Sequence, residues 1–182
     1  MLRHLPNFLS ALRLALAPAT AGFVATDNFM AAFGVFAFAG FTDAIDGTLA
    51  KILKCPTPLG KFLDPTADKA LMLAAFLALA FIGDIPVWLA VIVIGRDVLI
   101  GCAVAIGMAR HMPIDTTPLF IGKLTTALQI TYLGAHLAAL AFAFSLGRAV
   151  PADGYILAVL TVASGLAYAQ RWFAAMRTRA PA

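Results

Sequence analysis

Long apolar runs fill most of the chain, and short polar or proline-containing segments separate them. A helix that crosses a bilayer needs roughly 20 mostly apolar residues. By this measure the pattern predicts six membrane-spanning helices, at residues 9–26, 29 to about 46, about 64–82, 86–108, 118–146 and 155 to about 176. Turn-forming residues mark the breaks, as at 27–28, 56–58 and 151–154.

The second and third of these runs are too short to cross a bilayer by their apolar residues alone. Uninterrupted apolar sequence covers only 29–41 and 70–82. Each run reaches spanning length only if the neighbouring aspartate-bearing turns, around 43–46 and 64–68, are also helical. The carboxylates would then lie near one membrane face, inside the helix bundle rather than against lipid.

The composition points to the same class of protein. Hydrophobic residues make up 62% of the 182-residue chain and charged residues 12%, and the mean hydropathy is +0.93. A soluble domain carries about 25% charged residues. We therefore expect an all-α integral membrane protein with six transmembrane helices, a single domain over 1–182 and a polar cavity that faces the cytoplasm. Nothing in the chain suggests nucleic-acid binding.

Basic residues separate by side once six spans are assumed. One side of the membrane receives nearly all of them when helix ends are counted: Arg3, Arg13, Lys51, Lys54, Lys61, Lys69, Arg110, Lys123, Arg171, Arg177 and Arg179. The other side receives Arg148, together with Asp27, Asp84 and Asp153. Because cytoplasmic segments carry the excess of Lys and Arg, this pattern places both termini and the aspartates in the cytoplasm. We expect a multi-pass protein of a bacterial-type inner (cytoplasmic) membrane.

Four aspartates stand out in this apolar background. Asp43 and Asp46 are three residues apart and Asp64 and Asp68 four apart, so the members of each pair lie on one face of a helix. Charged groups at membrane depth are costly and usually serve ions, protons or substrates. Carboxylate oxygens suit hard divalent cations, Mg²⁺ or Mn²⁺. An isolated acidic pair at a helix end is more often a solvated cap, but four in this register favour a functional site.

The segment has a fixed order, which reads Asp43, two residues, Asp46-Gly47, two residues, Ala50-Lys51, eight residues, Gly60, three residues, Asp64, three residues, Asp68. It resembles the signature of the CDP-alcohol phosphatidyltransferases in every spacing. One position departs from that signature, because the family has arginine where this chain has Lys51. A lysine is a point charge and cannot make the bidentate contact of a guanidinium, so binding at this position could be looser.

The resemblance implies roles for these residues. In the family the first three aspartates hold a pair of metal ions, and the fourth both contacts metal and acts as general base; here these are Asp43, Asp46, Asp64 and Asp68. The cofactor expected is thus Mg²⁺ or Mn²⁺, with two ions. Residues expected to bind CDP-diacylglycerol are Asn7, Ser10, Gly47, Ala50, Lys51, Thr57 and Gly60. Gly47 leaves room for a phosphate to approach the backbone, and Ala50 keeps the groove open.

Three other groups of residues carry alternatives. Asn7, Ser10 and Arg13 match residues near the nucleotide in similar enzymes, or else they are a helix cap and an arginine that snorkels to the membrane surface. Arg96, followed by Asp97, is either a neutralised structural pair or a residue that binds the acceptor's phosphate. Lys123 is either an acceptor ligand or an interfacial lysine.

The function expected is metal-dependent transfer of a phosphatidyl group from CDP-diacylglycerol to an alcohol, with release of CMP. The first acceptor considered is sn-glycerol 3-phosphate, since Arg96 and Lys123 are available for a phosphate. The Arg-Asp sequence at 96–97 is instead typical of members that make cardiolipin from phosphatidylglycerol, which is the alternative. A small ion transporter is a different class of explanation, but a proton or ion relay should cross the membrane, and these acids gather near one face. Family members are commonly homodimers, and small residues near the end of the chain (Ala163, Ser164, Gly165, Ala167) would allow close helix packing.

Overall fold

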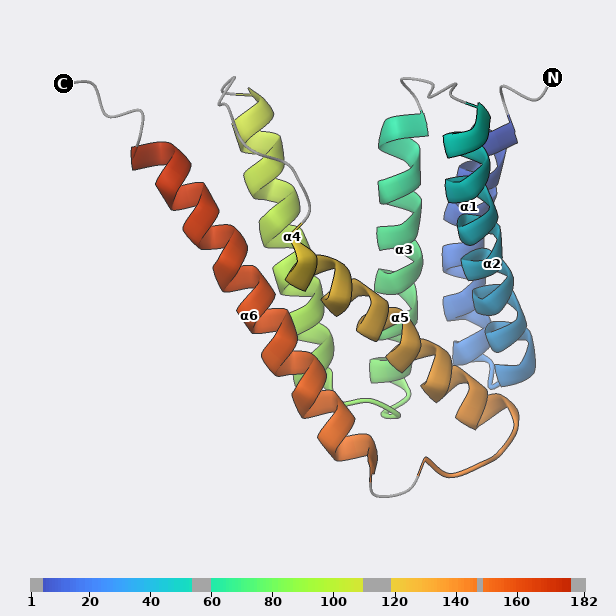
Figure 1. The fold of residues 1–182 in the computed structure, drawn as a ribbon. Helices are drawn as coiled ribbons and strands as arrows, with labels where there is room; N and C mark the ends of the chain where they lie inside the picture. Colours follow the sequence, from blue (N-terminus) through green and yellow to red (C-terminus); the bar gives the residue numbers. More distant parts are fainter. Residues whose placement is uncertain (1–4, 54–59, 110–118, 147–148, 178–182) are drawn as a thin grey trace. The chain divides into compact units, whose positions relative to one another are not determined.

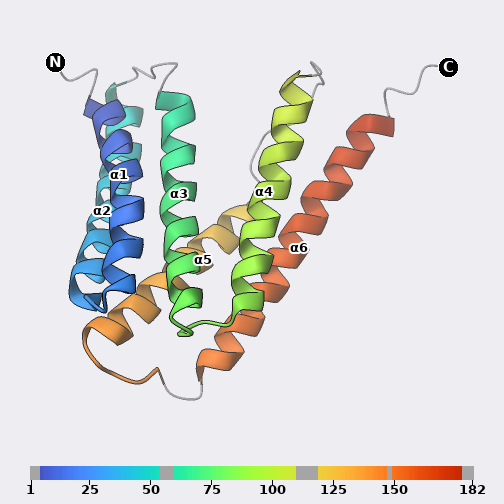
Figure 2. The same ribbon diagram turned by 180° about the vertical axis from the view of Figure 1, so that it is seen from behind.

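The computed structural model describes residues 5–53, 60–109, 119–146 and 149–177, with side chains for all of these except 5–7, 44–53, 60–65, 108, 149–151, 175 and 177. The described part of the chain forms six α-helices, shown in Figures 1 and 2. They are α1 (Leu5–Ala25), α2 (Phe29–Leu53), α3 (Gly60–Phe81), α4 (Val87–Ala109), α5 (Phe120–Ala141) and α6 (Ala149–Arg177).

The expectation that the aspartate-bearing turns are helical is confirmed. The second helix, α2, continues through Asp43 and Asp46 to Leu53, and α3 already begins at Gly60, ahead of Asp64 and Asp68. Each helix is therefore longer than its apolar run, at 25 and 22 residues. The polar turns extend these two helices rather than ending them.

The expected end of the fifth helix is wrong. The apolar run continues to Leu146, but α5 ends at Ala141, and Ala143 has a φ of 52°. A left-handed residue cannot continue a right-handed helix, so the backbone turns here despite its apolar sequence. The last helix, by contrast, begins earlier than expected, because α6 includes the Pro- and Gly-containing segment from Ala149 to Gly154.

Within the described ranges, four helical segments are long and apolar enough to cross a membrane: Phe8–Ala25, Val87–Gly107, Phe120–Ala141 and Ala152–Ala174. A shorter apolar stretch, Phe29–Asp43, lies in α2. Many large apolar side chains also point outward, including Phe81, Leu99 and Phe120, each more than two-thirds exposed. Apolar outer faces on long helices suit a lipid environment, and we describe the chain as a multi-pass membrane protein. The count of six spans and the cytoplasmic cavity remain predictions.

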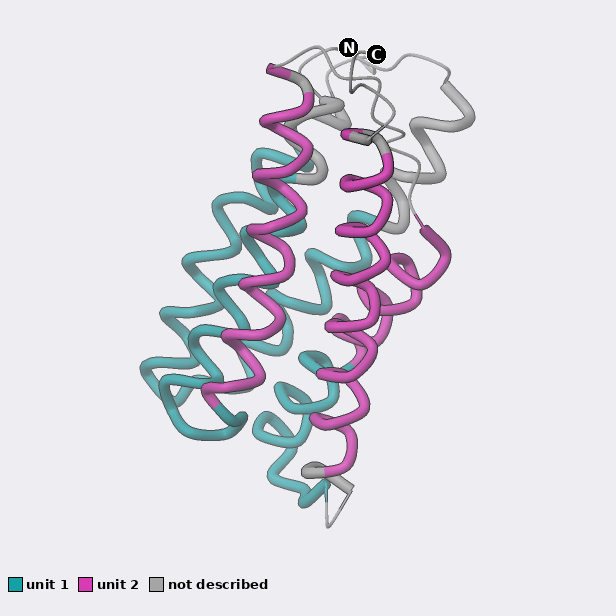
Figure 3. Tube along the Cα trace, turned by 90° about the vertical axis from the view of Figure 1, so that its left-hand side faces the viewer, with its two compact units in different colours: residues 1–86, 132–146 teal, residues 87–131, 147–182 magenta. Residues whose placement is uncertain are grey.

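The helices fall into two compact units, coloured separately in Figure 3. Unit 1 contains residues 1–86 and 132–146, and unit 2 contains 87–131 and 147–182. The boundary passes through α5, whose first half belongs to unit 2 and whose second half belongs to unit 1. A single domain over the whole chain remains a prediction.

In unit 1, α1 packs against both α2 and α3, and the three helices lie side by side in Figures 1 and 2. Alanines occupy buried positions on all three helices: Ala17, Ala32, Ala39, Ala67 and Ala75. Small side chains let helix backbones approach closely, which is how helices associate in a membrane. Larger buried residues, including Phe76, Leu79, Leu133 and Leu137, fill the rest of this core.

The turn after α3 is joined to α5 within the same unit. Gly83 adopts a φ of 79°, which turns the chain after the helix. The carboxylate of the next residue, Asp84, lies 2.6 Å from Nδ1 of His136 on α5. The His136 ring also lies against Tyr132, with ring centroids 4.4 Å apart. This pair fixes the α3–α4 turn against the second half of α5.

In unit 2, α4 packs against α6. Near the start of both helices, the rings of Trp88 and Tyr155 stack with centroids 5.3 Å apart. The first half of α5 also contacts α6, because the Thr125 hydroxyl donates a hydrogen bond to the Leu160 carbonyl at 3.3 Å. Unit 2 thus holds α4, α6 and the start of α5 together.

Candidate active site

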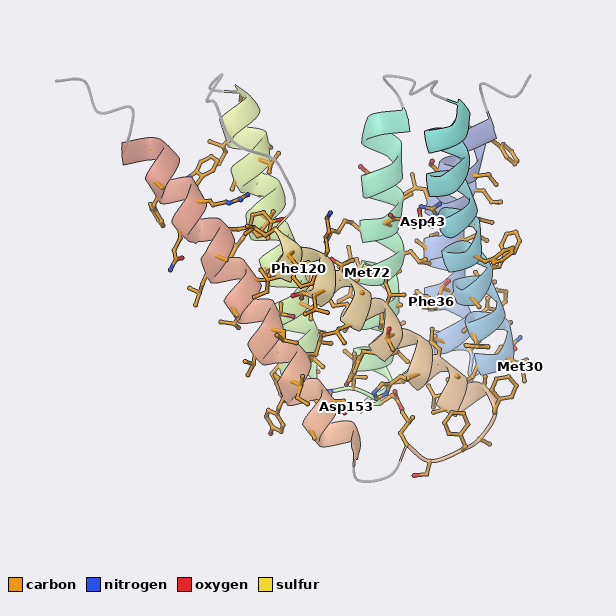
Figure 4. The ribbon with its side chains drawn as sticks, in the orientation of Figure 1. Met30, Phe36, Asp43, Met72, Phe120 and Asp153 are labelled. Carbon is orange, nitrogen blue, oxygen red and sulfur yellow. The ribbon has the colours of Figure 1, made fainter. Side chains whose placement is uncertain are left out.

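A single buried arginine joins the two aspartate-bearing helices of unit 1. Arg13, in the middle of α1, is only 1% exposed. Its Nη1 lies 2.8 Å from Oδ1 of Asp43 on α2 and also forms an ion pair and a hydrogen bond with Oδ1 of Asp68 on α3. Figure 4 shows Asp43 on the part of α2 that lies beside α1 and α3. Two of the four predicted metal ligands are therefore brought together around one cationic nitrogen.

Helix geometry explains how the guanidinium reaches both carboxylates. Residues three apart share a helix face, so Ser10 and Arg13 lie on the side of α1 that faces the other helices, and both are buried. The Asp43 and Asp68 side chains remain 50% and 42% exposed. Arg13 is thus the buried member of the cluster, and the carboxylates remain accessible from outside it. The alternative that Arg13 snorkels to the membrane surface is wrong.

Several predicted site residues have only their backbone described, or lie outside the described residues. Asp46, Gly47, Ala50 and Lys51 continue α2 after Asp43, and Asp64 lies one turn before Asp68 in α3, with Gly60 as the first residue of that helix. Asn7 is in the first turns of α1. Thr57 lies outside the described residues. The structure does not test the side-chain roles assigned to these positions, which remain predictions.

The donor set suits a divalent cation. Carboxylate oxygens from two different helices converge on the same positively charged Arg13 nitrogen. Carboxylate oxygens are the ligands that Mg²⁺ and Mn²⁺ prefer. Among the residues with described side chains, no cluster of three or more His, Cys, Asp or Glu occurs. The other two predicted ligands, Asp46 and Asp64, are not among them.

Arg96 in unit 2 is also buried and has several partners. Its Nη1 lies 2.7 Å from Oδ1 of the adjacent Asp97, and its Nη2 donates to the Ser164 hydroxyl on α6 at 2.6 Å. The Tyr168 ring lies beneath the guanidinium, with its centroid 5.6 Å from Cζ. The neutralised pair foreseen from the sequence is therefore present, and the acceptor-binding role remains a prediction. Arg96 is 9% exposed.

Lys123 lies in the first turn of α5, directly after Gly122, whose backbone lies close to Arg96. Its side chain is exposed, and its backbone N–H donates to the Leu119 carbonyl at 3.1 Å. The preceding residue, Gly122, is buried against Arg96 and Tyr168: a Cβ at this position would lie 3.4 Å from Arg96 Nη2. The two predicted acceptor residues thus belong to the same unit, on neighbouring elements.

The sequence pattern does not identify the partners of Arg96. By that pattern Ser164 is only a small packing residue, and Tyr168 has no assigned role. A tyrosine inside an apolar span is a usable signal, because its hydroxyl needs a polar partner when it is buried. The sequence alone does not say which partner it has.

The chain belongs to the CDP-alcohol phosphatidyltransferase family, whose sequence model matches residues 3–175. The resemblance seen in the aspartate signature is thereby confirmed. The match covers α1 to α5 and nearly all of α6, and it includes both the Arg13–Asp43–Asp68 cluster and the Arg96 cluster.

Among its relatives, the chain is similar to the cardiolipin synthase (CMP-forming) of Rattus norvegicus, with 36% identity over 157 residues, or 78% of this chain and 52% of the relative. It is also similar to a probable phosphatidylglycerophosphate synthase of Mycobacterium tuberculosis, with 32% identity over 174 residues, or 92% of this chain and 81% of the relative. A CDP-diacylglycerol--glycerol-3-phosphate 3-phosphatidyltransferase of Pseudomonas fluorescens is 43% identical over 103 residues, or 53% of this chain and 52% of the relative. The chain spans about half the length of the rat and Pseudomonas relatives.

Proposed function

We propose that this protein transfers the phosphatidyl group of CDP-diacylglycerol to the hydroxyl of a glycerol-phosphate alcohol and releases CMP. The observation that carries the proposal is the convergence of Asp43 and Asp68 on Arg13, because it joins both halves of the family signature in one cluster. The family match over residues 3–175 supports it.

On the donor side, the residues of unit 1 act on the CDP pyrophosphate. Asp43, Asp46, Asp64 and Asp68 would hold two Mg²⁺ or Mn²⁺ ions, and bound ions of this kind neutralise a pyrophosphate and stabilise the leaving phosphate. Lys51 adds a positive charge one turn beyond Gly47 in α2. Asn7, Ser10, Gly47, Ala50, Thr57 and Gly60 complete the proposed nucleotide-lipid site.

Asp68 is the proposed general base. It accepts the proton of the acceptor hydroxyl while the oxygen of that hydroxyl attacks the lipid-bearing phosphorus, and the phosphorus–oxygen bond to CMP breaks. A base must reach the hydroxyl that it deprotonates, and the Asp68 side chain is 42% exposed. The ion pair with Arg13 holds the Asp68 carboxylate in one place between α1 and α3.

For the acceptor we place phosphatidylglycerol first. The positive charge of Arg96 is balanced by Asp97, and two of its nitrogens are already engaged. Such a residue suits the single negative charge of a phosphodiester better than the two charges of a phosphomonoester. The rat relative is named as a cardiolipin synthase, which agrees with this choice.

sn-Glycerol 3-phosphate, the acceptor favoured from the sequence, is the second candidate. The exposed Lys123 side chain beside the Arg96 cluster supplies an unburied positive charge for a phosphomonoester. The Mycobacterium tuberculosis relative, named as a probable phosphatidylglycerophosphate synthase, matches most of this chain and most of its own length. Both candidates are glycerol phosphates with a free hydroxyl.

The proposal includes a location. The protein would cross a bacterial-type inner membrane six times, with both termini in the cytoplasm, where CDP-diacylglycerol head groups are accessible. We propose that it forms a homodimer. The distribution of Lys and Arg along the sequence supports this orientation.

Release of CMP tests the function directly. Purified protein in detergent–lipid micelles is incubated with CDP-diacylglycerol, Mg²⁺ or Mn²⁺, and either phosphatidylglycerol or sn-glycerol 3-phosphate. We expect metal-dependent CMP release that is faster with phosphatidylglycerol and forms cardiolipin. Faster release with glycerol 3-phosphate would reverse the order of the acceptors. Absence of CMP release with both acceptors, even when metal is present, would reject the proposed reaction.

A further inference from the structure

Tyr168 on α6 contacts both elements that carry the predicted acceptor residues. Its ring lies against the Arg96 guanidinium of α4, and its hydroxyl accepts a hydrogen bond from the Leu119 N–H at the start of α5. We propose that Tyr168 is a positioning residue for the acceptor site. It would fix Arg96 and the first turn of α5, which carries Lys123, relative to each other. This inference rests on the proposed function, because it assumes that Arg96 and Lys123 bind the acceptor.

The ring fixes one side of the guanidinium. The distance from Cζ of Arg96 to the ring centroid is 5.6 Å, within the range in which a cation is attracted to an aromatic face. Asp97 and Ser164 bind two of the guanidinium nitrogens, Nη1 and Nη2. The ring contact and these two hydrogen bonds together leave Arg96 little freedom to rotate.

The hydroxyl fixes the beginning of α5. The first N–H groups of a helix have no partner within the helix, and the Leu119 N–H donates to the Tyr168 hydroxyl at 3.2 Å. The Leu119 carbonyl in turn accepts from the Lys123 N–H at 3.1 Å. Tyr168 is thus linked through Leu119 to the backbone of Lys123. This link fixes the position of the Lys123 backbone, from which the side chain extends.

Gly122 shows that this contact is close. A Cβ added at Gly122 would lie 3.1 Å from both the Cε2 and the hydroxyl oxygen of Tyr168. Few real Cβ atoms have neighbours this near, so a larger residue at position 122 would push the ring, the first turn of α5, or both. The glycine before Lys123 therefore allows α5 to rest directly on Tyr168.

Tyr155 provides a matched control. It is on the same helix, and its ring also stacks on an aromatic residue of α4, Trp88. Trp88 lies in the first turn of α4, about two turns before Arg96, so this ring contact is separate from the Arg96 cluster. Substitutions at Tyr155 therefore report the cost of losing an α4–α6 ring contact in general.

The kinetic test compares Tyr168→Phe, Tyr168→Leu, Tyr155→Phe and Tyr155→Leu with the unchanged protein. Loss of the ring in Tyr168→Leu should raise the acceptor KM about tenfold, as expected for a desolvated cation–aromatic contact, while the KM for CDP-diacylglycerol stays within about twofold. Tyr168→Phe, which keeps the ring, should raise the acceptor KM only about threefold, the size of one lost hydrogen bond. Equal effects of the Tyr168 and Tyr155 changes on both KM values would overturn the inference.

A second measurement does not depend on activity. Hydrogen–deuterium exchange of the peptide that contains residues 119–123 should be faster in Tyr168→Phe than in the unchanged protein and in Tyr155→Phe. Unchanged exchange would refute the hydroxyl contact even if the protein were inactive with both acceptors. Failure of the proposed reaction would instead appear as absence of CMP release in the unchanged protein, so the two failures are separable.

Discussion

Arg13 and Arg96 are the two buried arginines among the described residues, and they are held in different ways. The ionic partner of Arg96 is its neighbour in the sequence, so that pair is local to α4. Arg13 instead bridges carboxylates of two other helices. Removing one member of an ion pair leaves the charge of the other uncompensated. Loss of Arg13 would leave the carboxylates of Asp43 and Asp68 close together without a counter-charge.

Replacement of Arg13 by methionine should make the protein depend on a divalent cation for its stability. In the presence of a chelator the variant should melt at a lower temperature than the unchanged protein, because Asp43 and Asp68 lose their counter-charge. Added Mg²⁺ should then raise its melting temperature more than that of the unchanged protein, in which Arg13 already offsets part of the carboxylate charge that the ions would neutralise. Thermal unfolding in detergent measures both.

The control for this prediction is Arg171→Met, which removes an exposed arginine on α6. It should leave the response to Mg²⁺ unchanged. If Mg²⁺ stabilises neither protein, the carboxylates around Arg13 do not form a cation site, and an equal gain in both would mean that Arg13 does not offset their charge.

Asp68→Asn should abolish CMP release while CDP-diacylglycerol still binds. An amide keeps the size of the side chain but cannot accept the proton of the acceptor hydroxyl, and loss of a general base commonly costs about 10² to 10⁴ in rate. The measurement is CMP release alongside retention of labelled CDP-diacylglycerol on the immobilised protein. Asp84→Asn, at an ion-paired aspartate of the same unit outside the signature, is the control; an active Asp68→Asn protein would reject the assignment.

At the scale of helices, the sequence predicts features that depend on residue spacing, such as which aspartates share a helix face. It does not predict features that depend on the folded backbone, such as where α5 ends. The register of Asp43 and Asp46 on one helix and Asp64 and Asp68 on another is visible in the sequence, because helix periodicity is local. The end of α5 was not visible, because the residues after Ala141 are as apolar as those before it. The turn there depends on the backbone at Ala143, which periodicity does not report.

The Asp84–His136 contact is another feature that the sequence pattern does not reveal, because the two residues are 52 positions apart. His136→Ala should destabilise the protein by about 1.5–3 kcal/mol, the usual contribution of a hydrogen bond to a charged group, because Asp84 loses its contact and the α3–α4 turn is released from α5. We expect a lower melting temperature with an unchanged KM for CDP-diacylglycerol. Thr131→Ala, at an exposed position of α5 whose hydroxyl bonds only within its own helix, should melt like the unchanged protein. Equal melting of both variants would mean that the pair contributes nothing.

For the whole molecule, composition and charge predicted the class, and the family match confirmed it. The signature residues could be assigned because their spacing is fixed within one stretch of sequence. Arg13 could not, because its partners lie 30 and 55 residues further on and only the folded helices bring them together. Tyr168 escaped notice for the same reason, since Leu119 is 49 residues before it.

The proposed orientation predicts opposite labelling of different segments in intact cells. With the native cysteines replaced by serine, Asn28→Cys and Asp153→Cys should react with an impermeant thiol reagent from outside. Arg179→Cys should react only after permeabilisation, because the excess of Lys and Arg keeps that terminus inside. The readout is the labelled fraction before and after permeabilisation, and external labelling of Arg179→Cys would reject the orientation with both termini in the cytoplasm.

The buried Arg13 also has a consequence for how the protein is made. A charged residue inside an inserting helix is costly, about 2.5–3.5 kcal/mol at the helix centre, and Arg13 is the sixth residue of the apolar segment Phe8–Ala25. During synthesis α1 emerges before either of its ionic partners, and Asp68 follows 55 residues later. The first helix should therefore gain stability when α2 and α3 join it, so we expect these three helices to leave the insertion machinery as a group rather than one at a time.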